Sequence, residues 1–273
     1  MSYRHSRDTS QSPFGCASVV RRCGIVAAVS EQLVTTEMRG AVCIVRLNRE
    51  AKLNAMSEAL CGQLLDALAG EQVRASRVLV LAGSPRAFSA GADLTEFTDD
   101  SVDATLRYYR GPGRVWEALP ALPQPSIAAI SGWAVGGGLE LALSADLRVA
   151  DSTARFALPE VSLGILPSAG GMTRLVRLLG TARAKELILL GQRFDAARAL
   201  ELGVINRMVA EGEAESAALE WAALMAEQPQ AALQVTRELI DRSAEMSMAA
   251  SLAAERAAQG MLSTAAESYR ASQ

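Results

Sequence analysis

Two glutamates, Glu140 and Glu160, lie twenty positions apart in a stretch where nearly every other residue is apolar or small. Burial raises the pKa of a carboxyl group, and a second carboxylate nearby raises it further. One of the two can then act as an acid while the other acts as a base near neutral pH. The pair predicts acid–base chemistry in residues 131–171. The competing interpretation makes Glu140 a first-turn helix acid, stabilised by the helix dipole, and Glu160 a surface charge.

A glycine cluster, Gly136-Gly137-Gly138, precedes Glu140 and leads into an apolar helix start. Such a turn leaves N–H groups uncovered, and the positive end of the helix dipole adds to their field. A second small-residue turn, residues 87–94, contains Gly91 and Ala92 some 45 residues upstream. The amides of Ala92 and Gly137 could together form an oxyanion hole for an ester or thioester carbonyl. For residues 87–94 alone, a tight turn needed only for packing is the alternative.

Other catalytic groups are scarce. The single histidine, His5, lies in a polar N-terminal tail, which excludes a Ser-His-Asp or Cys-His nucleophile and any histidine-ligated zinc site. The cysteines lack Cys-x-x-Cys spacing, so we expect reduced thiols and no metal site; they are Cys16, Cys23, Cys43 and Cys61. The chemistry must therefore use carboxylates, backbone amides or a cofactor.

The composition of the 273 residues argues against two classes of partner. A formal charge of -3, a pI near 5.4 and 4% aromatic residues give no footprint for nucleic acid. No apolar run reaches the roughly 18–20 residues needed to cross a bilayer. We therefore expect neither a nucleic-acid partner nor a membrane partner.

The elements that must position these residues alternate between strand and helix. Apolar, β-branched runs predict strands at residues 41–47, 78–82, 126–130 and 147–150. Helical spacing appears at residues 56–68, with Ser57 as its cap, and at 99–119, broken at 111–113. Short helices follow at 173–179, 182–190 and 196–202, then an extended piece at 204–209 and helix from 213 onward. This order predicts an α/β fold with right-handed crossovers.

Three parts are expected along the chain. Residues 1–30, rich in Ser and Arg, are predicted to be a disordered extension or the product of an upstream start, with a mitochondrial transit peptide as the alternative. Residues 31–205 form the predicted core, and residues 206–273 form a helical C-terminal region. The compartment is predicted to be cytoplasmic, or the mitochondrial matrix if the extension is a transit peptide.

Three sequence blocks give the chain its resemblance to a known family. They are Ala-Phe-Ser-Ala-Gly-Ala-Asp-Leu at residues 87–94, the glycine-rich block at 127–142, and Arg-Phe-Ala-Leu-Pro-Glu-Val-Ser-Leu-Gly-Ile-Leu-Pro at 155–167. Through these blocks the sequence resembles the crotonase family of enoyl-CoA hydratases and isomerases, over about residues 33–265. The resemblance implies a crotonase-like spiral of β-β-α turns with a helical C-terminal trimerisation region.

The same resemblance implies roles for the residues singled out above. The thioester oxygen of an acyl-CoA would be held by the amides of Ala92 and Gly137. Glu140 would hold and deprotonate the water that attacks the β-carbon, and Glu160 would deliver a proton to the α-carbon. Many relatives with other chemistry lack one of these glutamates, so the presence of both favours hydration.

Recognition of coenzyme A is implied less directly. A family pattern, Asn-Arg-Pro-x-x-x-Asn-Ala, reads here as residues 48–55 with Glu50 in place of proline. Lys52 and Arg86 are either phosphate contacts or solvated charges, and Asp93 is expected to cap its loop. Ser168, where many hydratases have glycine, leaves acyl chain length open. Trp116 and Trp133 could line the acyl tunnel, with core packing as the alternative for Trp133. The implied substrate-binding residues are Ala51, Lys52, Leu53, Arg86, Ala90, Asp93, Leu94 and Gly136.

The resulting hypothesis is an enoyl-CoA hydratase that converts trans-2-enoyl-CoA to 3-hydroxyacyl-CoA. No metal or other cofactor is expected, since coenzyme A is part of the substrate. A homotrimer, or a dimer of trimers, is implied by the resemblance. Two alternatives stay open: an isomerase of the same fold, which needs only one carboxylate, and a non-catalytic relative that binds acyl-CoA or RNA.

Overall fold

The computed structural model describes residues 31–96, 98–99 and 101–271, with side chains up to residue 263. The predicted N-terminal extension, residues 1–30, lies outside the described residues. All the elements below belong to one compact unit, residues 32–273.

A six-stranded sheet forms the centre of this unit, in the order β1-β2-β3-β5-β7-β10. β1 pairs antiparallel with β2, and the remaining neighbours are parallel. Every residue of β3 and β5 is buried, as expected for apolar runs covered on both faces. The strands are β1 (Val34–Arg39), β2 (Val42–Leu47), β3 (Val78–Ala82), β5 (Ser126–Ile130), β7 (Leu147–Asp151) and β10 (Arg207–Val209).

A second, four-stranded sheet has the order β4-β6-β8-β9, with β4 (Ala87–Ser89), β6 (Trp133–Val135), β8 (Arg155–Ala157) and β9 (Phe194–Asp195). Its first three strands run parallel, and β9 pairs antiparallel with β8. Each of these three strands follows directly on a strand of the large sheet: β3 leads to β4, β5 to β6 and β7 to β8. The chain thus winds through repeated β-β-α turns, and the predicted spiral is confirmed.

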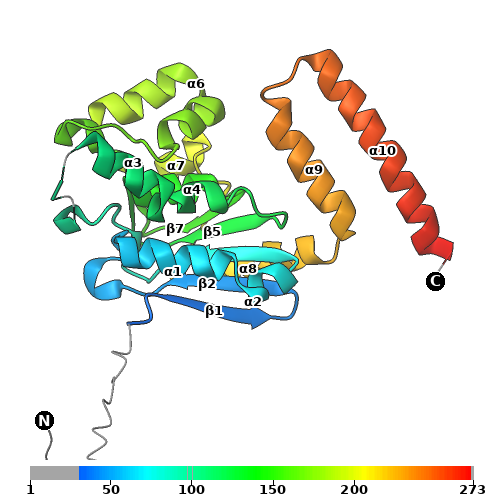
Figure 1. The fold of residues 1–273 in the computed structure, drawn as a ribbon, viewed down its shortest axis with the longest axis horizontal. Helices are drawn as coiled ribbons and strands as arrows, with labels where there is room; N and C mark the ends of the chain where they lie inside the picture. The colour runs from blue at the N-terminus through cyan, green and yellow to red at the C-terminus, as the bar shows by residue number, and fades with distance from the viewer. Residues whose placement is uncertain (1–30, 97, 100, 272–273) are drawn as a thin grey trace, which may run out of the picture. The chain divides into compact units, whose positions relative to one another are not determined.

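Helices cover both faces of the large sheet (Figure 1). α8 (Ala214–Ala226) packs on β3, β5 and β7 through buried alanines, whose small side chains allow close approach. The opposite face carries α1 (Glu58–Leu68), capped as predicted by the Ser57 hydroxyl, which accepts a hydrogen bond from the Leu60 amide. The other helices before α8 are α2 (Glu71–Ala75), α3 (Val102–Arg110), α4 (Val115–Ala118), α5 (Gly137–Ser144), α6 (Gly171–Leu190) and α7 (Ala196–Leu202).

Two sequence predictions of helix breaks are confirmed. α3 and α4 are separated by a 3-10 turn, η3 (Pro112–Arg114), as the glycines and proline there predict. α6 comprises two helical segments that meet at a kink at Gly180, whose φ of 77° and ψ of 167° are not helical.

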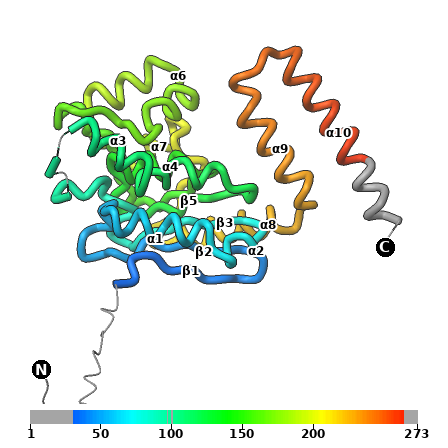
Figure 2. The backbone as a smooth tube through the Cα atoms, in the orientation of Figure 1, coloured from blue at the N-terminus to red at the C-terminus, as the bar shows by residue number. Residues whose placement is uncertain are grey.

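The C-terminal helices α9 (Gln230–Ser243) and α10 (Met248–Ala271) run antiparallel to each other (Figures 1 and 2). α9 is anchored to the preceding fold by Arg237, which forms an ion pair with Asp146 at 2.6 Å. The same guanidinium donates to the carbonyls of Leu122 and Pro120, both at 2.8 Å. The predicted helical C-terminal region is present, although its first segment contributes β10 to the large sheet.

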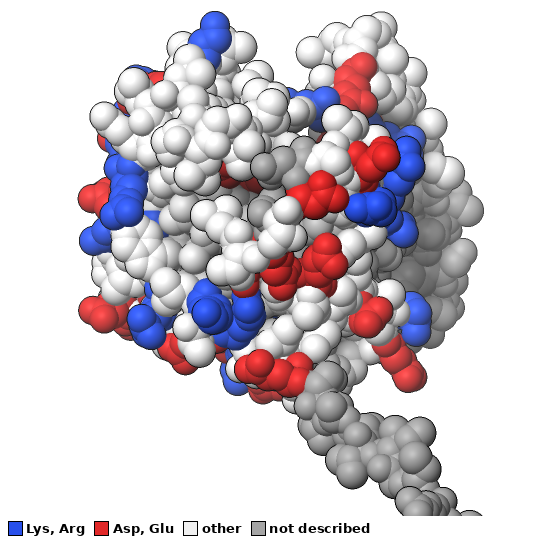
Figure 3. All heavy atoms as spheres, turned by 60° about the vertical axis from the view of Figure 1, so that its left-hand side comes forward, with Lys and Arg blue, Asp and Glu red and all other residues white. Residues whose placement is uncertain are grey.

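Among the residues that the structure describes, no helix combines the length and apolar character needed to cross a bilayer. Basic and acidic side chains are interspersed over the molecular face drawn in Figure 3.

Candidate active site

Three neighbouring parallel strands deliver the predicted site residues to one edge of the small sheet. Ala92 follows β4, Gly137 and Glu140 follow β6, and Glu160 follows β8. Because the carboxyl ends of adjacent parallel strands lie at the same edge, residues distant in sequence become neighbours. The structure therefore brings together all four residues predicted to take part in the chemistry.

The turn after β4 lies directly against the start of α5, and two glycines, Gly91 and Gly138, make this possible. A Cβ atom on Gly91 would lie 2.6 Å from the Val135 carbonyl oxygen, and one on Gly138 would lie 2.3 Å from the Ser89 carbonyl oxygen. A Cβ on Gly137 would lie 3.6 Å from the amide nitrogen of Ala92. Only residues without a Cβ let the two backbones approach this closely.

The two predicted oxyanion donors are both uncommitted. Within the described part of the chain, neither the Ala92 N–H nor the Gly137 N–H donates a hydrogen bond. Ala92 is paired with Met56 in a parallel bridge, but the bonds of that bridge use the amides of Met56 and Asp93. Gly137 is the first residue of α5, where backbone N–H groups have no partner within the helix. Two adjacent free amides can donate hydrogen bonds to a single oxygen atom and so stabilise the negative charge that develops on it.

Asn54 holds the β4 turn in place, and sequence reasoning did not assign it a role. Its buried side-chain amide donates to the carbonyls of Ala87 and Phe88, at 2.9 and 3.2 Å, and its oxygen accepts from the Arg49 amide. Ser89 returns a hydrogen bond to the Asn54 carbonyl at 2.8 Å. The available signal was the asparagine of the 48–55 pattern, which sequence reasoning read only as a part of coenzyme A recognition.

Glu140 projects from the first turn of α5 and is only 4% exposed. One carboxylate oxygen, Oε1, accepts hydrogen bonds from the amides of Ala169 and Gly171, at 2.9 and 2.8 Å. Burial raises the pKa of Glu140 to about 7, and the charge of Glu160 raises it too, while the two amides and Arg174 act in the opposite direction. The carboxyl is therefore fixed in orientation and able to change protonation near neutral pH.

Glu160 begins η4 (Glu160–Leu163) and is 7% exposed, so the surface-charge interpretation is wrong. Its Oε2 atom is buried and, within the described residues, has no hydrogen-bond partner. Burial raises the pKa of Glu160, which favours its protonated form. Oε1 lies over the backbone of Gly136, where a Cβ would be 2.9 Å away. A protonated carboxyl with an unused oxygen is suited to deliver a proton to a bound molecule.

The two carboxyls differ in their hydrogen bonding. Glu140 receives two backbone hydrogen bonds, whereas Glu160 has an unpartnered oxygen. Burial raises the pKa of both carboxyls, and the charge of Glu160 raises that of Glu140 further, so one proton can remain on the pair near neutral pH. This is the arrangement that an acid and a base need in one site.

Two hydroxyl groups border the carboxyls. Tyr109 of α3 and Ser168 share a short hydrogen bond. Burial is the main cause that raises the pKa of Tyr109, and the charges of Glu140 and Glu160 raise it further. Sequence reasoning noted Ser168 as a departure from glycine but did not identify Tyr109, which lies in an otherwise exposed helix.

The residues implied for coenzyme A are only partly brought together. Leu53, Ala90 and Trp133 line one hollow of about 220 Å³, together with Val135, Ala157, Pro159, Gly191 and Arg193. The Arg193 guanidinium lies over the Trp133 ring, 5.0 Å from its centroid. Arg193 adds a cation that had no signal in the sequence blocks. Trp116, by contrast, is 3% exposed and packs in the core.

The other implied contacts lie around this hollow or serve the fold. Lys52 and Arg86 are exposed and, in the described residues, form no ion pair, and Ala51 and Leu94 are also exposed. Gly136 precedes α5 with its amide bonded to the Ala157 carbonyl. Asp93 accepts from the amide and hydroxyl of Thr95 and pairs with Arg49 at 2.6 Å, which lowers its pKa to about 2. These contacts make Asp93 the predicted cap of its loop.

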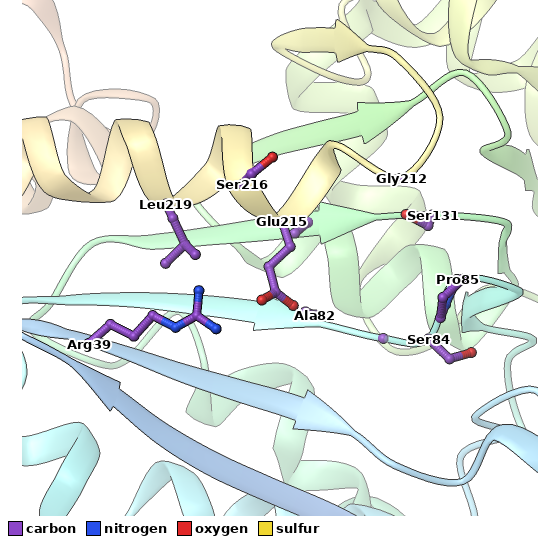
Figure 4. A pocket seen from close by; sticks show the side chains of 11 residues that line it. Arg39, Ala82, Ser84, Pro85, Ser131, Gly212, Glu215, Ser216 and Leu219 are labelled. Carbon is purple, nitrogen blue, oxygen red and sulfur yellow. The ribbon is translucent and has the colours of Figure 1, made fainter.

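A larger hollow, of about 370 Å³, opens beneath α8 at the carboxyl ends of β3 and β5 (Figure 4). None of the predicted site residues lines it. Its carboxylate, Glu215, is held at both oxygens by Arg46, at 2.5 and 3.0 Å. The pair of glutamates at the small sheet is therefore the candidate acid–base site.

Comparisons with known proteins agree with the overall fold. The model of the enoyl-CoA hydratase/isomerase family matches residues 37–271. A 2,3-dehydroadipyl-CoA hydratase of Escherichia coli (strain K12) is 38% identical over 229 residues, which cover 84% of this chain and 88% of that protein. The crystal structure of an enoyl-CoA hydratase from Bacillus anthracis aligns with a TM-score of 0.78 at 35% identity, covering 84% of this chain and 90% of that one. A Thermobifida fusca YX protein in complex with CoA aligns with a TM-score of 0.79 at 32% identity, covering 87% and 95%.

Proposed function

The chain belongs to the enoyl-CoA hydratase/isomerase family, and from that premise we propose that it hydrates trans-2-enoyl-CoA to 3-hydroxyacyl-CoA. The observation that carries the proposal is the pairing of Glu140 and Glu160, both buried, with two free amides at the same sheet edge. Isomerisation moves a proton without adding water and needs only one carboxylate. Two glutamates with different hydrogen bonding favour the hydratase reaction.

The proposed reaction begins with polarisation of the thioester. The amides of Ala92 and Gly137 donate to the thioester oxygen, which gains negative charge as the β-carbon is attacked. Ionised Glu140, held by the amides of Ala169 and Gly171, takes a proton from water as the water oxygen bonds to the β-carbon.

The second half of the proposed reaction uses Glu160. Its proton passes to the α-carbon as the enolate collapses and the thioester carbonyl re-forms. Water thus contributes its hydroxyl to the β-carbon, the α-carbon gains one hydrogen, and the pair of carboxyls still holds one proton, now on Glu140. Transfer of that proton back to Glu160 through solvent resets the site.

Binding of the coenzyme A moiety is proposed along the hollow that contains Leu53, Ala90 and Trp133. The complex of the Thermobifida fusca relative with CoA supports this class of ligand. Exposed Lys52 and Arg86 are proposed as phosphate contacts, with Ala51 and Leu94 beside them. No cofactor beyond the substrate's own coenzyme A is proposed, and the C-terminal helices are proposed to assemble the chain as a trimer.

The experiment that tests the function compares products. Purified protein is given trans-2-enoyl-CoA and 3-enoyl-CoA of several chain lengths, and 3-hydroxyacyl-CoA is quantified by mass spectrometry. We expect hydration of the 2-enoyl substrate, and a loss of orders of magnitude in the Glu160→Gln variant. Near-normal turnover in that variant, or conversion of 3-enoyl to 2-enoyl substrate without hydration, would refute the assignment.

A further inference from the structure

Arg174 lies one turn into α6, partly buried, and its guanidinium binds two carbonyl groups instead of a carboxylate. One terminal nitrogen donates to the Ala169 carbonyl at 3.0 Å, and the other donates to the Trp116 carbonyl at 2.8 Å. Within the described residues it forms no ion pair. A partly buried cation committed to main-chain oxygens fixes the backbone that carries them.

The Ala169 end of this contact leads directly to Glu140. The Ala169 residue offers its carbonyl to Arg174 and its amide to the Glu140 carboxylate. The next residue, Gly170, lies between the two residues whose amides bond Glu140. It has a φ of 95°, and a Cβ there would lie 2.3 Å from the Arg174 guanidinium. The guanidinium therefore packs on the bare backbone of the loop whose two amides orient Glu140.

The Trp116 end leads to the amide half of the site. The Trp116 indole N–H donates to the Gly137 carbonyl at 2.9 Å, and its ring lies 3.2 Å from where a Cβ of Gly137 would be. Arg174 thus bonds directly to the loop that orients Glu140, and it reaches the segment that presents the Gly137 amide through Trp116.

We propose that Arg174 is a positioning residue that holds the orienting loop of Glu140 and the Gly137 peptide in register with each other. The kinetic consequences of this inference rest on the proposed hydration, whereas the orientation of Glu140 by Arg174 can be tested without it. Arg174 also acts on Glu140 by charge. Glu140 is faced by Glu160 from η4, by Tyr109 from α3 and by Arg174 from α6, and Arg174 is the cation that opposes the effect of burial on its pKa.

Two variants separate the geometric effect from the charge effect. Arg174→Lys keeps the positive charge, but a single ammonium cannot span both carbonyls. We expect kcat to fall roughly tenfold to 100-fold, because misplacing reacting groups by about 1 Å can cost about 100-fold, while the acid limb of the pH–rate profile stays near that of the wild type. Arg174→Met loses both contacts and charge, so kcat falls and the acid limb moves to higher pH. KM should change far less than kcat in both.

Arg177→Met is the matched control. Arg177 lies one turn further along α6, is exposed, and pairs with Glu245 at 2.9 Å. This variant should keep the kcat and pH profile of the wild type. If folded Arg174→Met retains a kcat within twofold of that control, the positioning role is refuted. Thermal unfolding establishes that each variant is folded, and Arg174→Lys alone decides the kinetic question if Arg174→Met does not fold.

A second readout does not depend on activity. Carboxyl-¹³C glutamate labelling gives the Glu140 titration by NMR, with its resonance assigned from the Glu140→Gln variant. Removing Arg174 should raise the Glu140 midpoint in Arg174→Met and leave it nearly unchanged in Arg174→Lys. An unchanged midpoint in folded Arg174→Met would overturn the electrostatic part of the inference. If the wild type hydrates no enoyl-CoA, the proposed function fails, and this titration still decides the role of Arg174.

Discussion

Gly171 offers the sharpest test of how Glu140 is held. A Cβ atom at this position would lie 2.5 Å from Cγ of Glu140 and 2.9 Å from its Oε1. Carbon atoms in contact prefer roughly 3.5–4.0 Å, so in the Gly171→Ala variant the carboxylate must move by about 1 Å. The hydrogen bond from the Gly171 amide, 2.8 Å in the native protein, then lengthens beyond bonding range.

The expected cost of this displacement falls on catalysis. Moving a catalytic group by about 1 Å can reduce the rate about 100-fold, which corresponds to about 2.7 kcal/mol in the barrier. Loss of an amide donor should also raise the pKa of Glu140. Steady-state hydration kinetics over a range of pH would measure both effects.

Gly62→Ala is the matched control for that substitution. Gly62 lies within α1, and a Cβ there would meet no atom within 4 Å. Alanine in a helix interior is favoured over glycine by about 0.5–1 kcal/mol, so this variant should unfold at a slightly higher temperature with unchanged kcat. A Gly171→Ala enzyme with kcat within twofold of the Gly62→Ala enzyme would show that Glu140 is not positioned by this loop.

Three further predictions follow from other contacts. The rate of hydration should decline as pH falls through about 7, because Glu140 must be ionised to accept a proton and burial raises its pKa to about that value. A pH–rate profile with no acid limb between pH 6 and 8 would contradict this prediction. The folded-state pKa of Asp93 is lowered to about 2, so its carboxylate should stabilise the fold above the ordinary aspartate pKa of 3.8. That contribution should be lost as pH falls through about 2. The free energies of unfolding in urea of the wild type and Asp93→Asn should therefore differ at about pH 7 and converge near pH 2. Ser168→Gly should remove the hydroxyl bonded to Tyr109 and widen the space beside the glutamates. The expected result is a shift in kcat/KM toward longer enoyl chains, and an unchanged chain-length profile would refute this prediction.

Much of the fold could be predicted because its signals are local. The buried parallel strands β3 and β5 are continuous apolar runs, and the cap at Ser57 and the break at Gly180 are single-residue signals that act at short range. β1 was not predicted, because its residues Val34–Arg39 alternate weakly and gain their strand conformation by pairing with β2 at the sheet edge.

The site was predictable in its residue types and not in its contacts. Glu140, Glu160, Ala92 and Gly137 were found from spacing and resemblance, because glycines and buried carboxylates are unusual where they occur. The roles of Asn54, Tyr109 and Arg174 depend on which segments the spiral brings together, and each makes a bond across a sequence separation of 33 to 59 residues. No local pattern carries that information.

The pairing of β4, β6 and β8 also affects the order in which parts of the chain fold. Each of these strands comes from a different turn of the spiral, so the candidate site with its two amides and two glutamates cannot form until three distant segments have docked. Loop-closure entropy must be overcome before such non-local contacts stabilise the chain, and parallel sheets are therefore slow to form. We expect helical structure to appear early during refolding and the ability to bind a thioester to appear late. A nascent chain on the ribosome would then lack the complete candidate site until β8 and η4 have emerged.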